Sequence, residues 1–335
     1  MPAPIPQRTR NVFFLGAGFS RALGLPNTAE LLTEVHKLAR AKKLVIRGRL
    51  REAYKYFYPE EATSFIPDVV DFFSVLRAYE DVSVGTDGAP RFAGGFKDHT
   101  LLTDLRFIVV RLLCDRLRSI QVPDGGWPAV EAMLKPGHVI VTSNWDLFVE
   151  WYAACRNIRL RLGGVLGDST LTLIKLHGSL DWTESGFRKS GYPNADYAVV
   201  RELQNASRPR AIEIEPDDML RIRAVENMSK SWQFIKARTR RPHMIMMAQG
   251  KTVDMQPIQS MWDDAYKALC AAKELRIIGY SMPVDDVEIR TLLRAGIARG
   301  TQPTVVVQNP EPGVHVRVRT YVSRTARSDY SSFAI

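Results

Sequence analysis

The sequence has little cysteine and no long hydrophobic run. Its 335 residues include only three cysteines, Cys114, Cys155 and Cys270, which are far apart in the chain. This spacing excludes a disulfide framework and a CxxC zinc site, so we predict no metal. No apolar run approaches the roughly 20 residues that a membrane-spanning helix needs. Residues 1–10 lack the apolar segment of a signal peptide, so we predict a cytoplasmic protein with no membrane partner.

The composition is that of a soluble globular protein with an excess of positive charge. Hydrophobic residues make up 45% of the chain and charged residues 24%, which allows a sizeable core. The formal net charge is +10, with basic residues gathered at 37–51, 236–241 and 317–327. Such charge favours an anionic ligand, an acidic partner or nucleic acid. Charge alone is unspecific, and few aromatic residues lie among these basic residues. Nucleic acid is therefore kept only as an alternative partner.

Six short apolar runs predict buried parallel strands, because a strand covered on both faces is apolar at nearly every position. The runs are 12–15, 139–141, 171–176, 244–248, 275–278 and 304–307. Helical patterns lie between them. The predicted fold class is α/β, with a Rossmann-like, mostly parallel six-stranded sheet flanked by helices and carrying a large helical insertion.

The spacing of these runs predicts how the chain is divided. Residues 16–138 separate the first two strands, which is far longer than an ordinary crossover. We therefore predict a helical insertion at 31–129 and a second, polar insertion at 183–241. The core then comprises 11–30, 130–182 and 242–312, and 313–335 is a C-terminal tail. Two helix starts are also predicted, one with Asn27 and Glu30 as a capping box and one with Asp285 before Glu288.

The first predicted strand is followed by a glycine-rich turn. Gly16-Ala17-Gly18-Phe19-Ser20 comes directly after the strand, and Gly24-Leu25-Pro26 follows shortly after it. Glycines at this position let the backbone approach a phosphate closely, and a helix start offers free N–H groups. Arg21 stands where a dinucleotide fingerprint has its third glycine, so a simple tight turn remains the alternative.

Other predicted strands also end in small or polar residues. His177-Gly178 ends the strand at 171–176, and an imidazole there is a candidate acid or base. Each end alone is compatible with simple turn chemistry. Because ligands of open α/β sheets bind outside the carboxyl ends of the strands, their coincidence predicts a ligand site. The other ends are Thr142-Ser143-Asn144-Trp145-Asp146, Gly279-Tyr280-Ser281 and Gln308-Asn309-Pro310.

Taken in order, these motifs resemble those of the sirtuins, and more closely the zinc-free sirtuin-like domains of bacterial antiphage defence. The glycine turn with Pro26 resembles the sirtuin GAGxS…GxP loop, and His177-Gly178 resembles the catalytic HG pair. The segment 142–146 resembles the TQNxD motif, and 279–281 resembles the GTS loop. Asn309 resembles the asparagine that contacts the adenosine ribose.

The resemblance implies that NAD+ is bound as a substrate. It implies that Asn144 and Asp146 hold the nicotinamide ribose and its water, with His177 as the general base. The glycine loop would hold the pyrophosphate, and the predicted catalytic residues are His177 and Asn144. The predicted NAD+-binding residues are Gly16, Ala17, Gly18, Phe19, Ser20, Pro26, Thr142, Asn144, Asp146, His177, Gly279, Ser281 and Asn309.

Two departures from the sirtuin pattern bear on the reaction. Sirtuin deacetylases usually carry a zinc ribbon with two CxxC pairs after the HG pair, but residues 178–241 contain no cysteine. Asn27-Thr28-Ala29-Glu30 also stands where a Phe-Arg pair is expected. These departures favour an NAD+ glycohydrolase that forms nicotinamide and ADP-ribose. An NAD+-dependent protein deacylase and a non-catalytic module that binds NAD+, ADP-ribose or nucleic acid remain the alternatives.

The resemblance also implies a role as the effector of abortive infection, a form of antiphage defence. A constantly active enzyme of this kind would deplete the NAD+ of its own cell, so we expect control by assembly or by a partner. Related defence proteins self-assemble or act beside a HerA-type hexameric ATPase or a short Argonaute. A homo-oligomer and a separate partner of one of these kinds are therefore the predicted assemblies.

Overall fold

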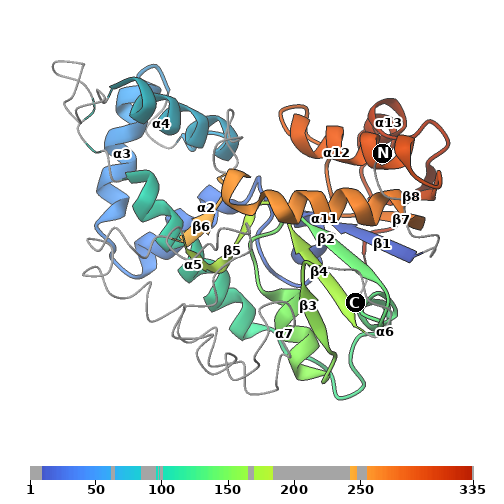
Figure 1. Cartoon of the computed structure of the whole chain (residues 1–335). Helices are drawn as coiled ribbons and strands as arrows, with labels where there is room; N and C mark the ends of the chain where they lie inside the picture. Colours follow the sequence, from blue (N-terminus) through green and yellow to red (C-terminus); the bar gives the residue numbers. More distant parts are fainter. Residues whose placement is uncertain are drawn as a thin grey trace.

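The computed structural model describes residues 10–61, 65–83, 96, 98, 101–164, 170–183, 242–246 and 255–333. Within these residues the chain forms a parallel sheet covered by helices, with a group of helices beside it (Figure 1). The predicted α/β class and the Rossmann-like, mostly parallel sheet are confirmed. The predicted second insertion, 183–241, lies outside the described residues apart from Thr183.

The main sheet has seven strands in the order β3-β4-β2-β1-β7-β8-β9, all paired in parallel. The central strand β1 has β2 on one side and β7 on the other, so the strand order reverses at β1. A reversal of this kind opens a crevice at the carboxyl ends of the strands. The strands are β1 (Arg10–Leu15), β2 (Val139–Thr142), β3 (Leu160–Leu162), β4 (Leu171–Lys175), β7 (Ala272–Ile278), β8 (Thr304–Gln308) and β9 (Arg327–Asp329).

The predicted number of six strands is wrong, and so is the placement of the run at 244–248. In the structure β6 (Pro242–Met244) pairs antiparallel with β5 (Gly178–Thr183) in a separate two-stranded sheet. Met244, Ile245 and Met246 are buried without belonging to the main sheet. Their apolar character therefore reflects packing outside that sheet. The other predicted runs all lie in the main sheet. The additional members are β3 and β9, which are short and lie at its two edges.

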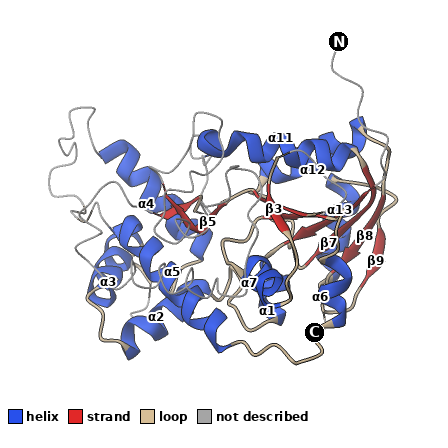
Figure 2. Ribbon diagram, turned by 60° about the horizontal axis from the view of Figure 1, so that its bottom comes forward, coloured by secondary structure: helices blue, strands red, loops and turns tan. Residues whose placement is uncertain are grey.

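Helices cover the sheet, and α2 to α5 form a separate group beside it, as Figures 1 and 2 both show. This group falls inside the predicted insertion at 31–129. The segment predicted as a tail, 313–335, supplies α13 and the edge strand β9. The helices are α1 (Ala17–Ala22), α2 (Leu31–Ala41), α3 (Ile46–Phe57), α4 (Val69–Ser83), α5 (Leu101–Ser119), α6 (Pro128–Met133), α7 (Phe148–Cys155), the short 3-10 helix Gln256–Ile258, α11 (Gln259–Cys270), α12 (Val287–Arg299) and α13 (Pro312–Tyr321).

The two predicted helix starts have different outcomes. Asn27 and Glu30 exchange hydrogen bonds, with each backbone N–H donating to the other side chain at 3.1 and 3.0 Å. The capping box before α2 is therefore confirmed. The prediction for Asp285 is wrong, because α12 begins at Val287 and Asp286 occupies the N-cap position. No helix of the described residues is long and apolar enough to cross a membrane.

Candidate functional site

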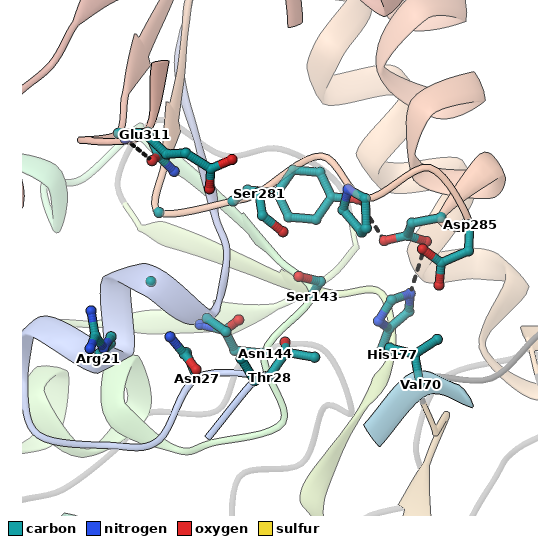
Figure 3. Close-up of a pocket in the computed structure, with 18 of the residues that line it drawn as sticks. Arg21, Asn27, Thr28, Val70, Ser143, Asn144, His177, Ser281, Asp285 and Glu311 are labelled. Carbon is teal, nitrogen blue, oxygen red and sulfur yellow. Dashed lines mark hydrogen bonds and ion pairs between the residues drawn. The ribbon is translucent and has the colours of Figure 1, made fainter. Parts of the chain in front are cut away.

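A cavity of about 1470 Å³ lies at the carboxyl ends of the strands where the order of the sheet reverses. Its walls include the turns after β1, β2, β7 and β8, together with His177, which follows β4 (Figure 3). Helix α4, from the group beside the sheet, forms a further wall through residues 70–78. The cavity therefore joins the sheet to the helical group, at the place where ligands of open α/β sheets bind.

The glycine turn after β1 packs directly against the turn after β7. The backbone N–H of Gly18 donates to the carbonyl of Gly279 at 2.7 Å. A Cβ on Gly16 would lie 2.4 Å from the Cα of Tyr280, and one on Gly18 would lie 2.7 Å from the oxygen of Gly279. Because real Cβ atoms do not approach backbone so closely, the fold itself requires both glycines. The N–H of Gly18 is already used within the protein.

Asn144 is held by a chain of hydrogen bonds that fixes the direction of its amide. Its Nδ2 donates to the carbonyl of Gly16 at 3.0 Å and to Oγ of Ser20 at 2.9 Å. Oγ of Ser20 in turn donates to Oδ2 of Asp146 at 2.7 Å. The Oδ1 atom of Asn144 is buried and has no hydrogen-bond partner within the part of the chain that the structure describes. Asn144 lines the cavity, so a buried acceptor without a described partner belongs to one of the cavity's own lining residues.

Asp146 and Lys175 support the turn that carries Asn144. Oδ1 of Asp146 accepts a hydrogen bond from the backbone N–H of Phe148 at the start of α7, at 2.9 Å. Nζ of Lys175 donates to the carbonyl of Asp146 at 2.5 Å and to Oε1 of Glu150 at 3.0 Å. The side chains of Lys175 and Glu150 are only 1% and 5% exposed. This buried ion pair fixes the backbone next to Asn144.

His177 lies on the opposite side of the cavity from the glycine turn (Figure 3). It lies two residues after the end of β4, is 4% exposed, and its carbonyl accepts a hydrogen bond from the N–H of Ile245 at 2.9 Å. Gly178 has a φ of +79°, and a Cβ there would lie 2.1 Å from the carbonyl oxygen of His243. The glycine after His177 is therefore required where β5 meets β6.

A carboxylate stands beside the His177 ring. Nε2 of His177 lies 3.9 Å from Oδ1 of Asp286, and the other oxygen of Asp286 accepts a hydrogen bond from Tyr280 at 2.6 Å. Burial, and then the Asp286 carboxylate, hold the pKa of Tyr280 well above its usual value. The Tyr280 hydroxyl therefore keeps its proton near neutral pH and remains a hydrogen-bond donor.

The structure brings part of the predicted NAD+-binding set to the cavity and places the rest behind it. The residues that line the cavity are Ala17, Gly18, Asn144, His177, Gly279, Ser281 and Asn309. The residues that do not line it are Gly16, Phe19, Ser20, Pro26, Thr142 and Asp146. Several of the latter support the lining, as Ser20 and Asp146 do through the Asn144 network. Ligand binding by either set remains a prediction.

The sequence reasoning assigned no site role to several residues of the cavity wall. Arg21 reaches the cavity with its side chain 61% exposed and paired with Glu30 at 2.9 Å. Asp71 and Arg77 line it from α4, and Asp286 from the turn before α12. No local sequence signal tells which face of α4 meets the sheet. Among the described residues, no cluster of three or more His, Cys, Asp or Glu side chains is arranged to hold a metal ion.

No family model matches the sequence, and no curated protein matches it. Among solved structures, the chain is similar to a mutant Sir2 homologue in complex with 2′-O-acetyl ADP-ribose, with 13% identity, a TM-score of 0.42, and coverage of 98% of this chain and 88% of the other. A structure described for the mechanism and regulation of Sir2 enzymes has 11% identity, a TM-score of 0.39, and coverage of 96% and 87%. A Sir2 complex with an inhibitor, 2′-O-acetyl-ADP-ribose and a deacetylated peptide has 12% identity, a TM-score of 0.35, and coverage of 96% and 88%. Because these TM-scores are low, we argue the chemistry of the site from its own residues.

Proposed function

We propose that the cavity binds NAD+ and that the protein hydrolyses it to nicotinamide and ADP-ribose. The observation that carries this proposal is the pairing, in one cavity, of a buried unsatisfied acceptor and an imidazole. Oδ1 of Asn144 is the acceptor, and the imidazole of His177 lines the same cavity. An acceptor of this kind suits a ribose hydroxyl or a water molecule, and an imidazole suits proton transfer.

The size and charge of the cavity support a dinucleotide. Its volume of about 1470 Å³ exceeds the roughly 300–1,000 Å³ of most small-molecule pockets, so an extended ligand fits. The exposed guanidinium of Arg21 lies at the glycine turn, where it can meet a pyrophosphate. Asn309, after β8, lines the cavity and suits the adenosine side. The predicted placement of NAD+ along the strand ends is thus compatible with the residues present.

In the proposed reaction, the bond between C1′ of the ribose and the nicotinamide nitrogen breaks. Its electron pair goes to nicotinamide, which leaves as a neutral molecule, and positive charge develops on the ribose. A water molecule bonds to C1′ and its proton passes to His177 and then to solvent. Oδ1 of Asn144 orients the water or a ribose hydroxyl. Such groups accelerate the reaction because they stabilise the transition state more than the substrate.

Two features of the sequence favour hydrolysis over deacylation. Residues 178–241 contain no cysteine, so the paired CxxC motifs of a sirtuin zinc ribbon are missing from this stretch. Asn27, Thr28 and Ala29, which stand in place of the expected Phe-Arg pair, line the cavity. An NAD+-dependent deacylase needs a groove for an acyl-lysine peptide that these replacements do not support. Deacylation remains the second outcome that the product analysis must separate.

The test is NAD+ consumption with chromatographic detection of nicotinamide, ADP-ribose and acylated ADP-ribose. Purified protein is assayed with and without acyl-lysine peptides, beside the Asn144→Ala and His177→Ala variants. We expect ADP-ribose to form without peptide, and each variant to lose about 10²- to 10⁴-fold in kcat, because each removes a group used in proton transfer or its orientation.

The control for this assay is His36→Ala. His36 lies on α2, where its ring hydrogen-bonds to the Tyr54 hydroxyl at 2.9 Å, and it is not part of the cavity wall. This variant keeps the wild-type rate if the effect is specific to the site. Product that requires the peptide would replace the proposal with a deacylase. Binding without turnover would indicate a binding module, and no binding would overturn the NAD+ site itself.

We further propose that the activity serves antiphage defence and is switched on by assembly. The support is the sirtuin-like motif order of the defence branch and the cost to a cell of unregulated NAD+ loss. The expected partners are further copies of the chain, a HerA-type ATPase or a short Argonaute. The assay is therefore repeated over a range of protein concentrations and with the product of the neighbouring gene. A rate per subunit that is the same under all conditions would contradict control by assembly.

A further inference from the structure

Asp286 occupies a helix N-cap position but uses its carboxylate elsewhere. It is the N-cap residue of α12, yet its side chain makes no capping hydrogen bond to that helix. Aspartate is favoured at N-caps because its carboxylate accepts a hydrogen bond from the first free N–H groups. Here the residue is 5% exposed, and its two oxygens face Tyr280 and His177 instead. The carboxylate is therefore directed into the site and away from its own helix.

Tyr280 fixes the direction of this carboxylate. Its hydroxyl donates to Oδ2 of Asp286 at 2.6 Å, and its ring packs against Phe14 of β1 with centroids 4.9 Å apart. With Oδ2 engaged, Oδ1 is the oxygen that lies nearest the His177 ring, 3.9 Å from Nε2. Figure 3 shows His177 beneath the loop that carries Asp285, with the ion pair drawn as a dashed line. Separations of this size between catalytic groups often tighten when substrate binds.

We propose that Asp286 is a positioning residue for His177. Its carboxylate orients the imidazole and stabilises the protonated ring that forms when His177 takes a proton from the attacking water. The proton then leaves to solvent, and Asp286 remains ionised throughout. This inference rests on the proposed function for the direction of proton transfer, whereas the pairing of the two side chains is a property of the free protein. In this arrangement His177 is the base and Asp286 is the third group that orients its ring, as in other sites with an oriented base.

Other charged or titratable groups share the surroundings of His177 and must be separated from Asp286. Asp285 precedes Asp286 in the same turn and is exposed, and the Tyr280 hydroxyl donates a hydrogen bond to Asp286. His243 of β6 lies behind Gly178, with its Cδ2 3.3 Å from the position of a Cβ there. Helix α4, whose Val70 lies beside His177 in Figure 3, and the segment before it contribute Asp68, Asp71 and Arg77 to the cavity wall. Asp285 is the matched control because it carries the same charge one residue away.

The first test measures the pKa of His177 without any reaction. The protein is labelled with ¹⁵N-histidine, and the His177 signal is assigned by its loss in His177→Ala. An opposite charge about 4 Å away raises a histidine pKa, so Asp286→Asn is expected to lower it by about one unit or more. Asp285→Asn is expected to lower it by less than half as much, because exposed charges are screened. Equal pKa values in Asp286→Asn and the wild type would overturn the proposal.

A second variant controls for damage to the start of α12, which a substitution at its N-cap residue could cause. Asp286→Ser removes the charge and places a favoured N-cap residue before α12, so the fold is retained. We expect the same fall in the pKa of His177. A wild-type pKa in a folded Asp286→Ser protein would count against the pairing as decisively as one in Asp286→Asn.

The third measurement is the pH profile of NAD+ turnover. In Asp286→Asn, kcat is expected to fall at least about tenfold with little change in KM, and the acid limb of the kcat profile to move to lower pH. Asp286→Glu restores part of the rate. A shifted His177 pKa with unchanged kcat would overturn the positioning role. If no protein turns over NAD+, the proposed function fails while the NMR result still decides the pairing.

Discussion

One ion pair of the sheet region and the pairs of Glu34 in the helical group lie in different surroundings. In the sheet region, Lys175 and Glu150 are 1% and 5% exposed and stand 3.0 Å apart. In the helical group, Glu34 of α2 is 13% exposed but its partners Lys37 and Arg116 are 68% and 46% exposed. A solvated pair contributes little to stability, whereas a buried pair that loses one partner leaves an uncompensated charge. The difference indicates that the Lys175–Glu150 pair fixes local geometry, whereas the two pairs of Glu34 contribute little to stability.

The two regions meet in the cavity. The buried pair supports the carbonyl of Asp146, which lies two residues after Asn144. The helical group reaches the cavity through α4, whose Asp71 and Arg77 line it. Changes in the sheet region should therefore affect both stability and the site, and changes in the outer ion pairs should affect mainly stability, and only slightly.

Removing the buried cation is the largest expected disturbance. Lys175→Met should lower the free energy of unfolding by about 3–5 kcal/mol, because the buried carboxylate of Glu150 loses the Lys175 ammonium. Lys37→Met, at the exposed pair, should lower it by less than about 1 kcal/mol. Urea denaturation monitored by circular dichroism measures both. Similar losses in the two variants would mean that the buried and exposed pairs are energetically alike. Glu150→Gln added to Lys175→Met should recover part of the loss.

The contact between the turns after β1 and β7 is the next largest effect. Gly279 has a φ of +61°, and a Cβ there would lie 2.1 Å from the backbone nitrogen of Phe19. Gly279→Ala should cost about 1–2 kcal/mol for the left-handed backbone and about 1–3 kcal/mol more for overpacking. Gly24 is the control, since its φ is +87° with nothing within 4 Å of a Cβ. Gly24→Ala should show the first cost alone, and equal costs would contradict the close approach.

The smallest expected effect lies at the exposed pair. The hydrogen bond from Lys37 lowers the pKa of Glu34, burial opposes this, and Arg116 reinforces it. A lowered folded-state pKa gives stability that is present above the ordinary value of 4.5 and is lost as the pH falls below it. Glu34→Gln should therefore lower Tm slightly at pH 7 and not at all near pH 3. A difference in Tm that is constant from pH 7 to pH 3 would rule out this linkage.

The central strands were predictable because both faces of each are covered. β1, β2 and β4 each contain a short run of mainly apolar residues, and every position of β2 and β4 is buried, which is the pattern of strands covered on both faces. β3 and β9 escaped prediction for the opposite reason. They are edge strands of three residues, and β9 reads Arg-Ser-Asp, so neither length nor hydrophobicity marks them. β3 pairs with β4 and β9 pairs with β8, so each depends on a strand that is in place only in the folded sheet.

The polar strand ends converge because parallel strands of one sheet end at one edge. The sequence therefore determined that Asn144, His177 and Gly279 would share a site. It did not determine which polar side chains face the cavity and which support it from behind. Ser20 and Asp146 hydrogen-bond to each other, whereas Oδ1 of Asn144, which lines the cavity, has no hydrogen-bond partner among the described residues. That distinction depends on the side-chain rotamers and on hydrogen bonds between the ends of strands that are far apart in the sequence.

Asp285 and Asp286 show the same difference between what the sequence determines and what the tertiary structure decides. Both acids stand before α12, and the sequence identifies the helix start without saying which carboxylate is buried. The tertiary structure buries Asp286 against Tyr280 and His177 and leaves Asp285 exposed. Local patterns of hydrophobicity and turn residues set the strands, the helices and the edge at which the site lies. Packing between distant segments decides which side chains meet there, because a contact across more than one hundred residues leaves no periodic trace in the chain.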